Sequence, residues 1–230
     1  MNLHERAQAI HRKLLEHYGI PDWRNSLDVM DELVSTVLSQ NTNDTNRDRA
    51  FDALRRRFPT WEAVRDADES AVVEAIRPAG LANQKGPRIQ KILREITTQR
   101  GSLDLSFLKE LPSEQARSWI LQFKGVGPKT AAIVLLFSLG MPAFPVDTHI
   151  YRVSGRTGLR PEKMTVEQAH EHLAGLFPVD GYAPAHLNLI RLGREVCQAR
   201  QPKCHGCPIQ SYCDHYQRMG AAQASPQYKR

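Results

Sequence analysis

Apolar residues recur at three- and four-residue spacing along most of this chain, which is the pattern of helices that bury one face. The spacing is clearest from Leu27 to Leu38, where five apolar side chains form one stripe. A capping box of Asn2 and Glu5 predicts a first helix that runs to about Tyr18. Strand-like alternation is nearly absent, so we expect an all-α fold.

Polar caps and Gly or Pro residues mark the ends of the other expected helices. Ser26 is the expected cap of the helix that carries the stripe. The tail from Gln217 to Arg230 has no apolar period, and we expect it to be disordered. The remaining helices are expected around 46–58, 60–67, 69–76, 85–98, 113–123, 128–139, 148–155, 165–177 and 184–199.

Composition narrows the class of protein. A length of 230 residues suffices for one large domain or two modest ones, and the formal net charge of +6 is a weak sign of a polyanionic partner. The segment Met1–Gly19 lacks the uninterrupted apolar stretch of a signal peptide, and the most apolar run, Thr130–Phe144, is too short to cross a bilayer. We therefore expect a soluble, intracellular protein with no membrane association.

The cysteines form one cluster in the last third of the chain. All four belong to a C-x6-C-x2-C-x5-C pattern, which leaves none unassigned. Four thiolates in a short loop can surround zinc or a [4Fe–4S] cluster, and the spacing alone does not decide between them. Two disulfides are the weaker alternative in a reducing compartment. The expected metal ligands are Cys197, Cys204, Cys207 and Cys213.

A glycine-rich turn separates two expected helices. Gly125 and Gly127 permit a tight turn with exposed backbone N–H groups around Val126, and Pro128 suits the first position of the next helix. Backbone amides at a helix start bind phosphate regardless of base sequence. The turn therefore predicts a DNA backbone contact, with a helix-turn-helix whose glycines serve packing as the alternative.

Lys129 falls in the first turn of the helix that follows. The positive end of the helix dipole disfavours a protonated amine there, and a neutral amine is the form that attacks carbon. The alternative is an exposed lysine that binds phosphate. Asp147 is expected to cap a later helix, where first-turn donors keep it ionised and able to stabilise positive charge. His149 is expected to be packed or to face a phosphate.

Taken together, the segments Leu121–Thr130, Val146–Arg152 and the cysteine loop resemble the endonuclease III branch of the helix-hairpin-helix DNA glycosylases. The similarity extends from about residue 20 to 214. It implies that the cysteines bind a [4Fe–4S] cluster rather than zinc. It also implies a two-domain fold, with a six-helix barrel at 24–141 and an iron–sulfur cluster domain made of 1–23 and 142–216.

The resemblance also implies an activity. In that family, the lysine matching Lys129 attacks C1′ of the sugar, expels an oxidised pyrimidine and leaves a Schiff base that eliminates the 3′ phosphate. The aspartate matching Asp147 assists both steps. The expected partner is double-stranded DNA with damaged bases or abasic sites. We expect a monomer that acts at the nucleoid.

Excision requires that the base be flipped from the stack and the gap filled. Leu81 matches the apolar wedge of the family for the opposite strand. Asn41 stands where the family often has Gln, and this departure leaves Gln40 as the residue that can take over the contact on the lesion side. The alternative for this stretch is a polar loop at a helix end.

Two rival functions remain. Adenine glycosylases of the same scaffold place a glutamate where this chain has Thr36, and they lack a lysine at the position of Lys129. The other rival is a non-catalytic DNA-binding module that uses only the hairpin and the metal site. A nucleophilic role for Lys129 would distinguish the expected bifunctional glycosylase and abasic-site lyase from both.

Overall fold

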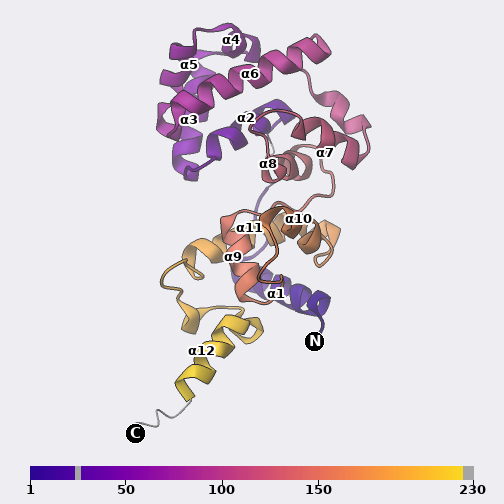
Figure 1. Cartoon of the computed structure of the whole chain (residues 1–230), viewed down its shortest axis with the longest axis vertical. Coiled ribbons are helices and arrows are strands. Elements are labelled where there is room, and N and C mark those ends of the chain that lie inside the picture. The colour runs from indigo at the N-terminus through magenta and orange to yellow at the C-terminus, as the bar shows by residue number, and fades with distance from the viewer. Residues whose placement is uncertain (24–26, 225–230) are drawn as a thin grey trace. The chain divides into compact units, whose positions relative to one another are not determined.

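The computed structural model describes residues 1–23 and 27–224, and the side chains up to residue 219. Over these ranges the chain is helical with connecting loops and has no strand, which confirms the all-α prediction (Figure 1). The chain divides into two compact units, one formed by Met1–Arg24 with Pro142–Arg230 and the other by Asn25–Met141. The domains expected from the sequence, 24–141 and 1–23 with 142–216, stay a prediction.

The central unit is built around α6, a 19-residue helix. Its core contains Leu33 and Val37 of α2, Leu54 of α3 and Leu93 of α6, none more than 1% exposed. Each of these side chains lies on the apolar stripe of its helix, so burial follows from the periodicity. The helices of this unit are α2 (Val29–Ser39), α3 (Asp44–Arg57), α4 (Trp61–Asp66), α5 (Glu69–Ala75), α6 (Ala82–Arg100), α7 (Ser113–Leu121) and α8 (Pro128–Ile133), with 3₁₀ turns η1 (Arg77–Ala79) and η2 (Ser106–Glu110).

The cap of α2 differs from the one expected. Asp28 is the N-cap, and its carboxylate accepts hydrogen bonds from the backbone N–H groups of Met30 at 2.9 Å and Asp31 at 3.0 Å. Ser26, the residue expected to cap this helix, lies outside the described residues. Two polar candidates two residues apart offer the same cap chemistry, and sequence does not rank them.

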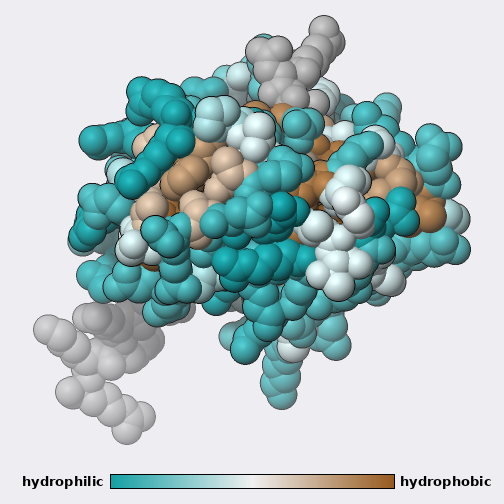
Figure 2. All heavy atoms as spheres, turned by 90° about the horizontal axis from the view of Figure 1, so that it is seen from above, coloured by the Kyte–Doolittle hydropathy of each residue, from teal (hydrophilic) through white to brown (hydrophobic). Residues whose placement is uncertain are grey.

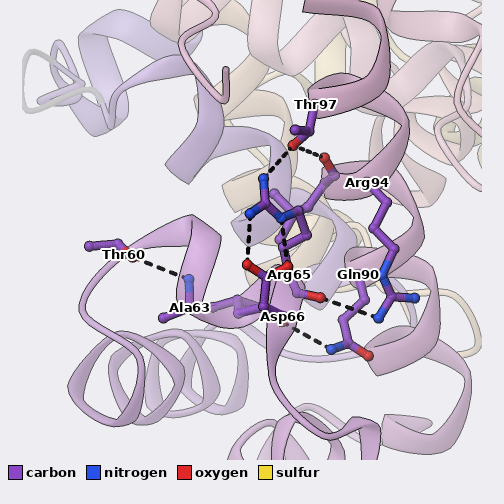
Figure 3. Close-up of polar contacts among 9 residues, drawn as sticks. Thr60, Ala63, Arg65, Asp66, Gln90, Arg94 and Thr97 are labelled. Atoms are coloured by element: carbon purple, nitrogen blue, oxygen red, sulfur yellow. Dashed lines mark hydrogen bonds and ion pairs between the residues drawn. The ribbon is translucent and has the colours of Figure 1, made fainter. Parts of the chain in front are cut away.

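Side-chain hydrogen bonds fix α4 against the middle of α6 (Figure 3). The buried amide of Gln90 donates to the carbonyls of Val64 at 3.0 Å and Ala67 at 2.8 Å. One turn further along α6, Arg94 donates to the carbonyl of Arg65 at 3.2 Å. The carbonyls that end α4 thus find their partners on α6, which locks the two helices together.

The helix predicted over 128–139 changes its winding partway. After α8 the chain makes a π-helical turn, η3, from Val134 to Ser138. The backbone N–H of Leu139 donates to the carbonyl of Val134 at 3.1 Å, a five-residue spacing. Such turns are rare inside helices and leave no periodic trace in a stretch as uniformly apolar as this one, so the pattern could not predict it.

The other unit combines the first helix of the chain with its last third. Helix α11 packs against both α1 and α9. Phe144 and Phe177 stack with ring centroids 5.0 Å apart, and both rings are buried. The helices are α1 (Leu3–Tyr18), α9 (Thr148–Arg156), α10 (Val166–Ala174), α11 (Tyr182–Glu195) and α12 (Asp214–Ala224), with 3₁₀ turns η4 (Val179–Gly181), η5 (Cys204–Gly206) and η6 (Gln210–Tyr212).

The disorder predicted for residues 217–230 is wrong for residues 217–224, which belong to α12. Asp214 opens this helix, and its carboxylate forms an ion pair with Arg6 of α1 at 2.7 Å. An acidic first residue and several Ala and Gln residues favour a helix without any apolar stripe. The lack of an apolar period was therefore a poor guide to the structure of this segment. The part from 225 onwards lies outside the described residues.

No helix within the described ranges is long and apolar enough to cross a membrane. Figure 2 views the protein from the end at which Figure 1 places α4, α5 and α6. Hydrophilic side chains cover most of that face, and apolar ones show between them in a few places. This distribution fits helices whose apolar stripes face the core.

Candidate functional site

The hairpin that leads into α8 has the predicted geometry. Val126 donates its backbone N–H to the carbonyl of Phe123 at 3.0 Å, and Gly125 takes φ +92°. Gly127 is the N-cap of α8, and Pro128 occupies the first helical position. The buried side chains of Phe123 and Val126 anchor the hairpin, while Gly125 stays exposed. The turn therefore presents main chain at its tip.

Glycine is required at position 125 by the neighbouring side chain of Arg88 as well as by the positive φ. A Cβ at this residue would lie 2.4 Å from Cδ and Nε of Arg88. Arg88 donates to Oε1 of Gln40 at 2.9 Å, and Nε2 of Gln40 donates to the carbonyl of Gly125 at 3.0 Å. The three residues form a closed contact between the end of α2, the first half of α6 and the hairpin.

We expect Gly125→Ala to destabilise the protein by about 1–3 kcal/mol, because a residue with a Cβ is strained at this φ. Arg88 must also move, and it then gives up its hydrogen bond to Gln40. The matched control is Gly127→Ala, since Gly127 has φ −102° and open space around the added Cβ. Urea unfolding of both variants measures the difference. Equal midpoints would show that neither the conformation nor the Arg88 contact matters.

Lys129 is the second residue of α8 and is half-buried. Buried Thr130 and Ala131 follow it, so the helix is held in the core while the lysine stands at its half-buried start. This is the predicted position in the first turn. Helix α8 is thus well anchored, and Lys129 directly follows the hairpin in the chain.

The loops that carry Asn41 and Leu81 share an unusual backbone. These two are the only non-glycine residues in the described ranges with positive φ, at +53° and +51°. Both are exposed, Leu81 by 48%. Gln40 differs from the expectation for a gap-filling residue, since both ends of its amide already bond to Arg88 and the hairpin. Asn41 and Leu81 are the exposed residues that share this backbone conformation.

Sequence reasoning missed Lys85. Its side chain is 1% exposed, and Nζ donates to the carbonyls of Leu38 at 2.7 Å and Ala79 at 2.8 Å. Burial, with a smaller contribution from Arg88, lowers the pKa of Lys85 to about 8. One signal could have found it, because Lys85 lies four residues before Ile89 on the apolar face of α6.

Asp147 occupies the N-cap of α9, as predicted. Its Oδ1 accepts a hydrogen bond from the backbone N–H of Ile150 at 2.8 Å, and the flanking Val146 and Ile150 are buried. The carboxylate is therefore held in place by the helix that it starts. His149 is half-buried and lies against Gly193 of α11, where a Cβ would come within 2.7 Å of it. Lys129 belongs to the central unit and Asp147 to the other one.

Two arginines one turn apart tie α9 to the segment of the first cysteine. Arg152 donates to the carbonyl of Cys197 at 2.9 Å and to that of Gly193 at 2.8 Å. Arg156 donates to the carbonyl of Gln198 at 2.7 Å and lies 3.3 Å from Sγ of Cys197. The helix capped by Asp147 and the cysteine loop are thereby parts of one hydrogen-bonded body.

All four cysteines line a single pocket, together with Arg156 and Tyr216. Burial raises the pKa of the Cys207 thiol to about 11 and also raises that of Cys213. Across the described residues, no three Cys, His, Asp or Glu side chains are grouped closely enough to hold one metal ion. Four cysteines around one pocket supply the four thiolates that a [4Fe–4S] cluster requires. The residues present therefore fit an iron–sulfur cluster.

The position that distinguishes adenine glycosylases carries no acid. Thr36 is buried in α2, and its hydroxyl donates to Oε1 of Glu32 at 3.2 Å. Burial raises the pKa of Glu32, which lies one helical turn earlier. A threonine that bonds to its own helix does not supply a carboxylate to a substrate. This geometry disfavours the adenine-specific alternative.

Comparisons with known proteins agree with these features. Residues 34–179 match the HhH-GPD superfamily of base excision DNA repair proteins. Residues 197–213 match the iron–sulfur binding domain of endonuclease III. The second match begins and ends at a cysteine and contains all four of them. The hairpin, Lys129 and Asp147 lie within the first.

Relatives and solved structures extend the match. The endonuclease III of Thermotoga maritima is 34% identical over 188 residues, which are 82% of this chain and 84% of that protein. An Arabidopsis thaliana protein named as a DNA glycosylase is 39% identical over 150 residues, or 65% of this chain, which spans only 51% of the plant protein. A solved non-covalent complex of an endonuclease III with DNA has the same fold, with a TM-score of 0.82 at 23% identity over 96% of this chain and 100% of that one.

Proposed function

The chain belongs to the HhH-GPD superfamily of base excision DNA repair proteins, and on that premise we propose that it is an endonuclease III-like DNA glycosylase and abasic-site lyase. Its substrates are oxidised pyrimidines in double-stranded DNA of the nucleoid. The observation that carries this proposal is Lys129 at the start of α8, directly behind the hairpin. Adenine glycosylases of this scaffold lack that lysine, and a simple binding module has no need of it.

The central unit holds the duplex by its backbone and opens it. The exposed main chain of Gly125 and the half-buried main chain of Gly127 contact phosphate without regard to sequence. Leu81, the exposed apolar residue of its loop, enters the stack on the opposite strand. Asn41 fills the gap on the lesion side, and Gln40, which bonds to the carbonyl of Gly125 in the hairpin, supports it. His149, which follows Asp147 by two positions in the chain, is proposed to face a phosphate from the other unit.

Lys129 is the nucleophile. Its amine nitrogen forms a bond to C1′ of the flipped nucleotide while the bond from C1′ to the base breaks, and the base leaves with that electron pair and takes up a proton. Opening of the sugar ring then gives a Schiff base between Lys129 and C1′. Loss of a proton from C2′ moves an electron pair that expels the 3′ phosphate. Water finally releases the lysine.

Asp147 supports both halves of this sequence. Its carboxylate is fixed at the start of α9 by the N–H of Ile150. A fixed negative charge stabilises the positive charge that develops on the sugar as the base departs. As the resemblance to the endonuclease III family implies, the same carboxylate also assists the strand-cleavage step.

Cys197, Cys204, Cys207 and Cys213 hold a [4Fe–4S] cluster. When bound, the cluster supplies a structural cross-link among four points of the C-terminal loop. Arg152 and Arg156 join that loop to α9, so the cross-link also steadies the helix that carries Asp147. The residues of the chain, rather than the cluster, perform the chemistry at the sugar.

A panel of damaged duplexes tests the proposal. Each duplex carries one lesion, namely an oxidised pyrimidine, an oxidised guanine opposite cytosine, adenine opposite oxidised guanine, or an abasic site. Base loss is scored after hot alkali and strand cleavage without it. We expect both events with the oxidised pyrimidine and cleavage at the abasic site. Base loss without cleavage would reveal a monofunctional enzyme, release of adenine would support the adenine-specific rival, and neither event on any duplex would leave a binding module.

A further inference from the structure

A buried lysine connects the two loops that carry Asn41 and Leu81. Nζ of Lys85 donates to the carbonyl of Leu38, at the end of α2, and to the carbonyl of Ala79, in η1. The side chain is 1% exposed, so these two carbonyls replace the water molecules that would otherwise solvate its amine. Burying an ionisable group is costly, and an apolar residue would pack on this face of α6 without that cost. The lysine therefore serves something other than stability.

The two carbonyls stand just before the two strained residues. Leu38 precedes Asn41 by three positions, and Ala79 precedes Leu81 by two. A non-glycine residue with positive φ persists only where its surroundings enforce that conformation. The carbonyl of Ala79 also accepts a hydrogen bond from the hydroxyl of Thr42, which follows Asn41 directly. Each loop is thus tied to the other at the base of its exposed residue.

Helix α6 is a firm support for this link. Beyond Lys85, its Gln90 and Arg94 bond to the carbonyls of α4, as Figure 3 shows. Between the two sites, Arg88 holds the amide of Gln40. One helix therefore sets the positions of both loops relative to the rest of the central unit.

We propose that Lys85 is a positioning residue that presents Asn41 and Leu81 together to the opened base pair. This inference rests on the proposed function, since it assigns the two loops to filling the gap that a flipped base leaves. Gap filling matters only where a stack has to be opened, because a base in a single strand is already unpaired. Loss of Lys85 should therefore impair action on duplex DNA selectively.

The test compares Lys85→Met with Gln90→Met. Both variants remove a buried side-chain nitrogen that donates to two backbone carbonyls from α6, but Gln90 bonds to α4, away from the loops. Strand cleavage at an abasic site is measured in duplex and in single-stranded oligonucleotides, below the unfolding temperature of each variant. For Lys85→Met we expect kcat/KM on the duplex to fall about 10²-fold, as misplaced contacts do, with little change on the single strand.

We expect Gln90→Met to lower thermal stability and to leave the ratio of duplex to single-strand activity near that of the wild type. Thr42→Val is the second variant, because it removes the hydrogen bond from the Thr42 hydroxyl to the carbonyl of Ala79. It should lower the ratio of duplex to single-strand activity as Lys85→Met does, but by less. An unchanged ratio in both Lys85→Met and Thr42→Val would overturn the inference. A wild-type protein that cleaves neither substrate would instead overturn the proposed function.

Discussion

Lys129→Gln should abolish strand cleavage at abasic sites, with a loss on the order of 10⁴-fold or more, because removal of a covalent nucleophile eliminates the pathway. Excision of oxidised pyrimidines should fall with it, since the same amine displaces the base. Nicking of an abasic duplex under single-turnover conditions measures the effect. The matched control is Lys124→Gln, which removes an exposed lysine from the same hairpin.

The loss cannot be attributed to unfolding. Lys129 stands in the first turn of α8, where a positive charge opposes the helix dipole, so its removal should stabilise the helix by about 0.3–1 kcal/mol. Binding to a duplex with a reduced abasic analogue should also persist, because the hairpin backbone is unchanged. If Lys129→Gln nicks abasic DNA as fast as Lys124→Gln, another group is the nucleophile.

Asp147→Asn is the second substitution with a large expected effect. The capping oxygen accepts from Ile150, and asparagine caps a helix about as well as aspartate, so the free energy of unfolding should change little. The variant lacks the negative charge opposite the developing cation, and loss of one such electrostatic contact costs about 10²–10³-fold in kcat. Turnover and thermal unfolding are therefore expected to separate.

Asp28→Asn provides the control for a cap without a catalytic role, because Asp28 caps α2 by the same chemistry. It should change neither stability nor turnover appreciably. Asp147→Ala should lose about 1 kcal/mol of stability in addition to the turnover effect, since alanine cannot cap. Normal excision by Asp147→Asn would remove the carboxylate from the mechanism and leave Asp147 as a cap alone.

The features that sequence predicted well are local. The capping box of Asn2 and Glu5, the hairpin that ends at Gly127 and Pro128, and the cap at Asp147 each depend on residues within three or four positions. Their chemistry is set by helix ends, where the unpaired backbone groups demand a few residue types. Sequence alone therefore placed both proposed catalytic residues on their elements.

The features that it missed depend on distant partners. The amide of Gln40 bonds to Gly125, 85 positions away, and Lys85 bonds to Leu38, 47 positions away. No periodic pattern predicts such a contact, although a lysine on the apolar face of a helix indicates that its side chain is buried. The helical character of residues 217–224 was missed for a different reason, since propensity rather than burial carries that helix.

The central claim is that Lys129 forms a covalent bond to the sugar, and borohydride trapping tests it most directly. The wild-type protein is incubated with a duplex that contains one oxidised pyrimidine in the presence of borohydride, and the complex is digested and analysed by mass spectrometry. We expect a stable protein–DNA adduct, with the sugar remnant attached to the peptide that contains Lys129, and no adduct from Lys129→Gln. An adduct at a different residue, or base release with no adduct, would contradict the account.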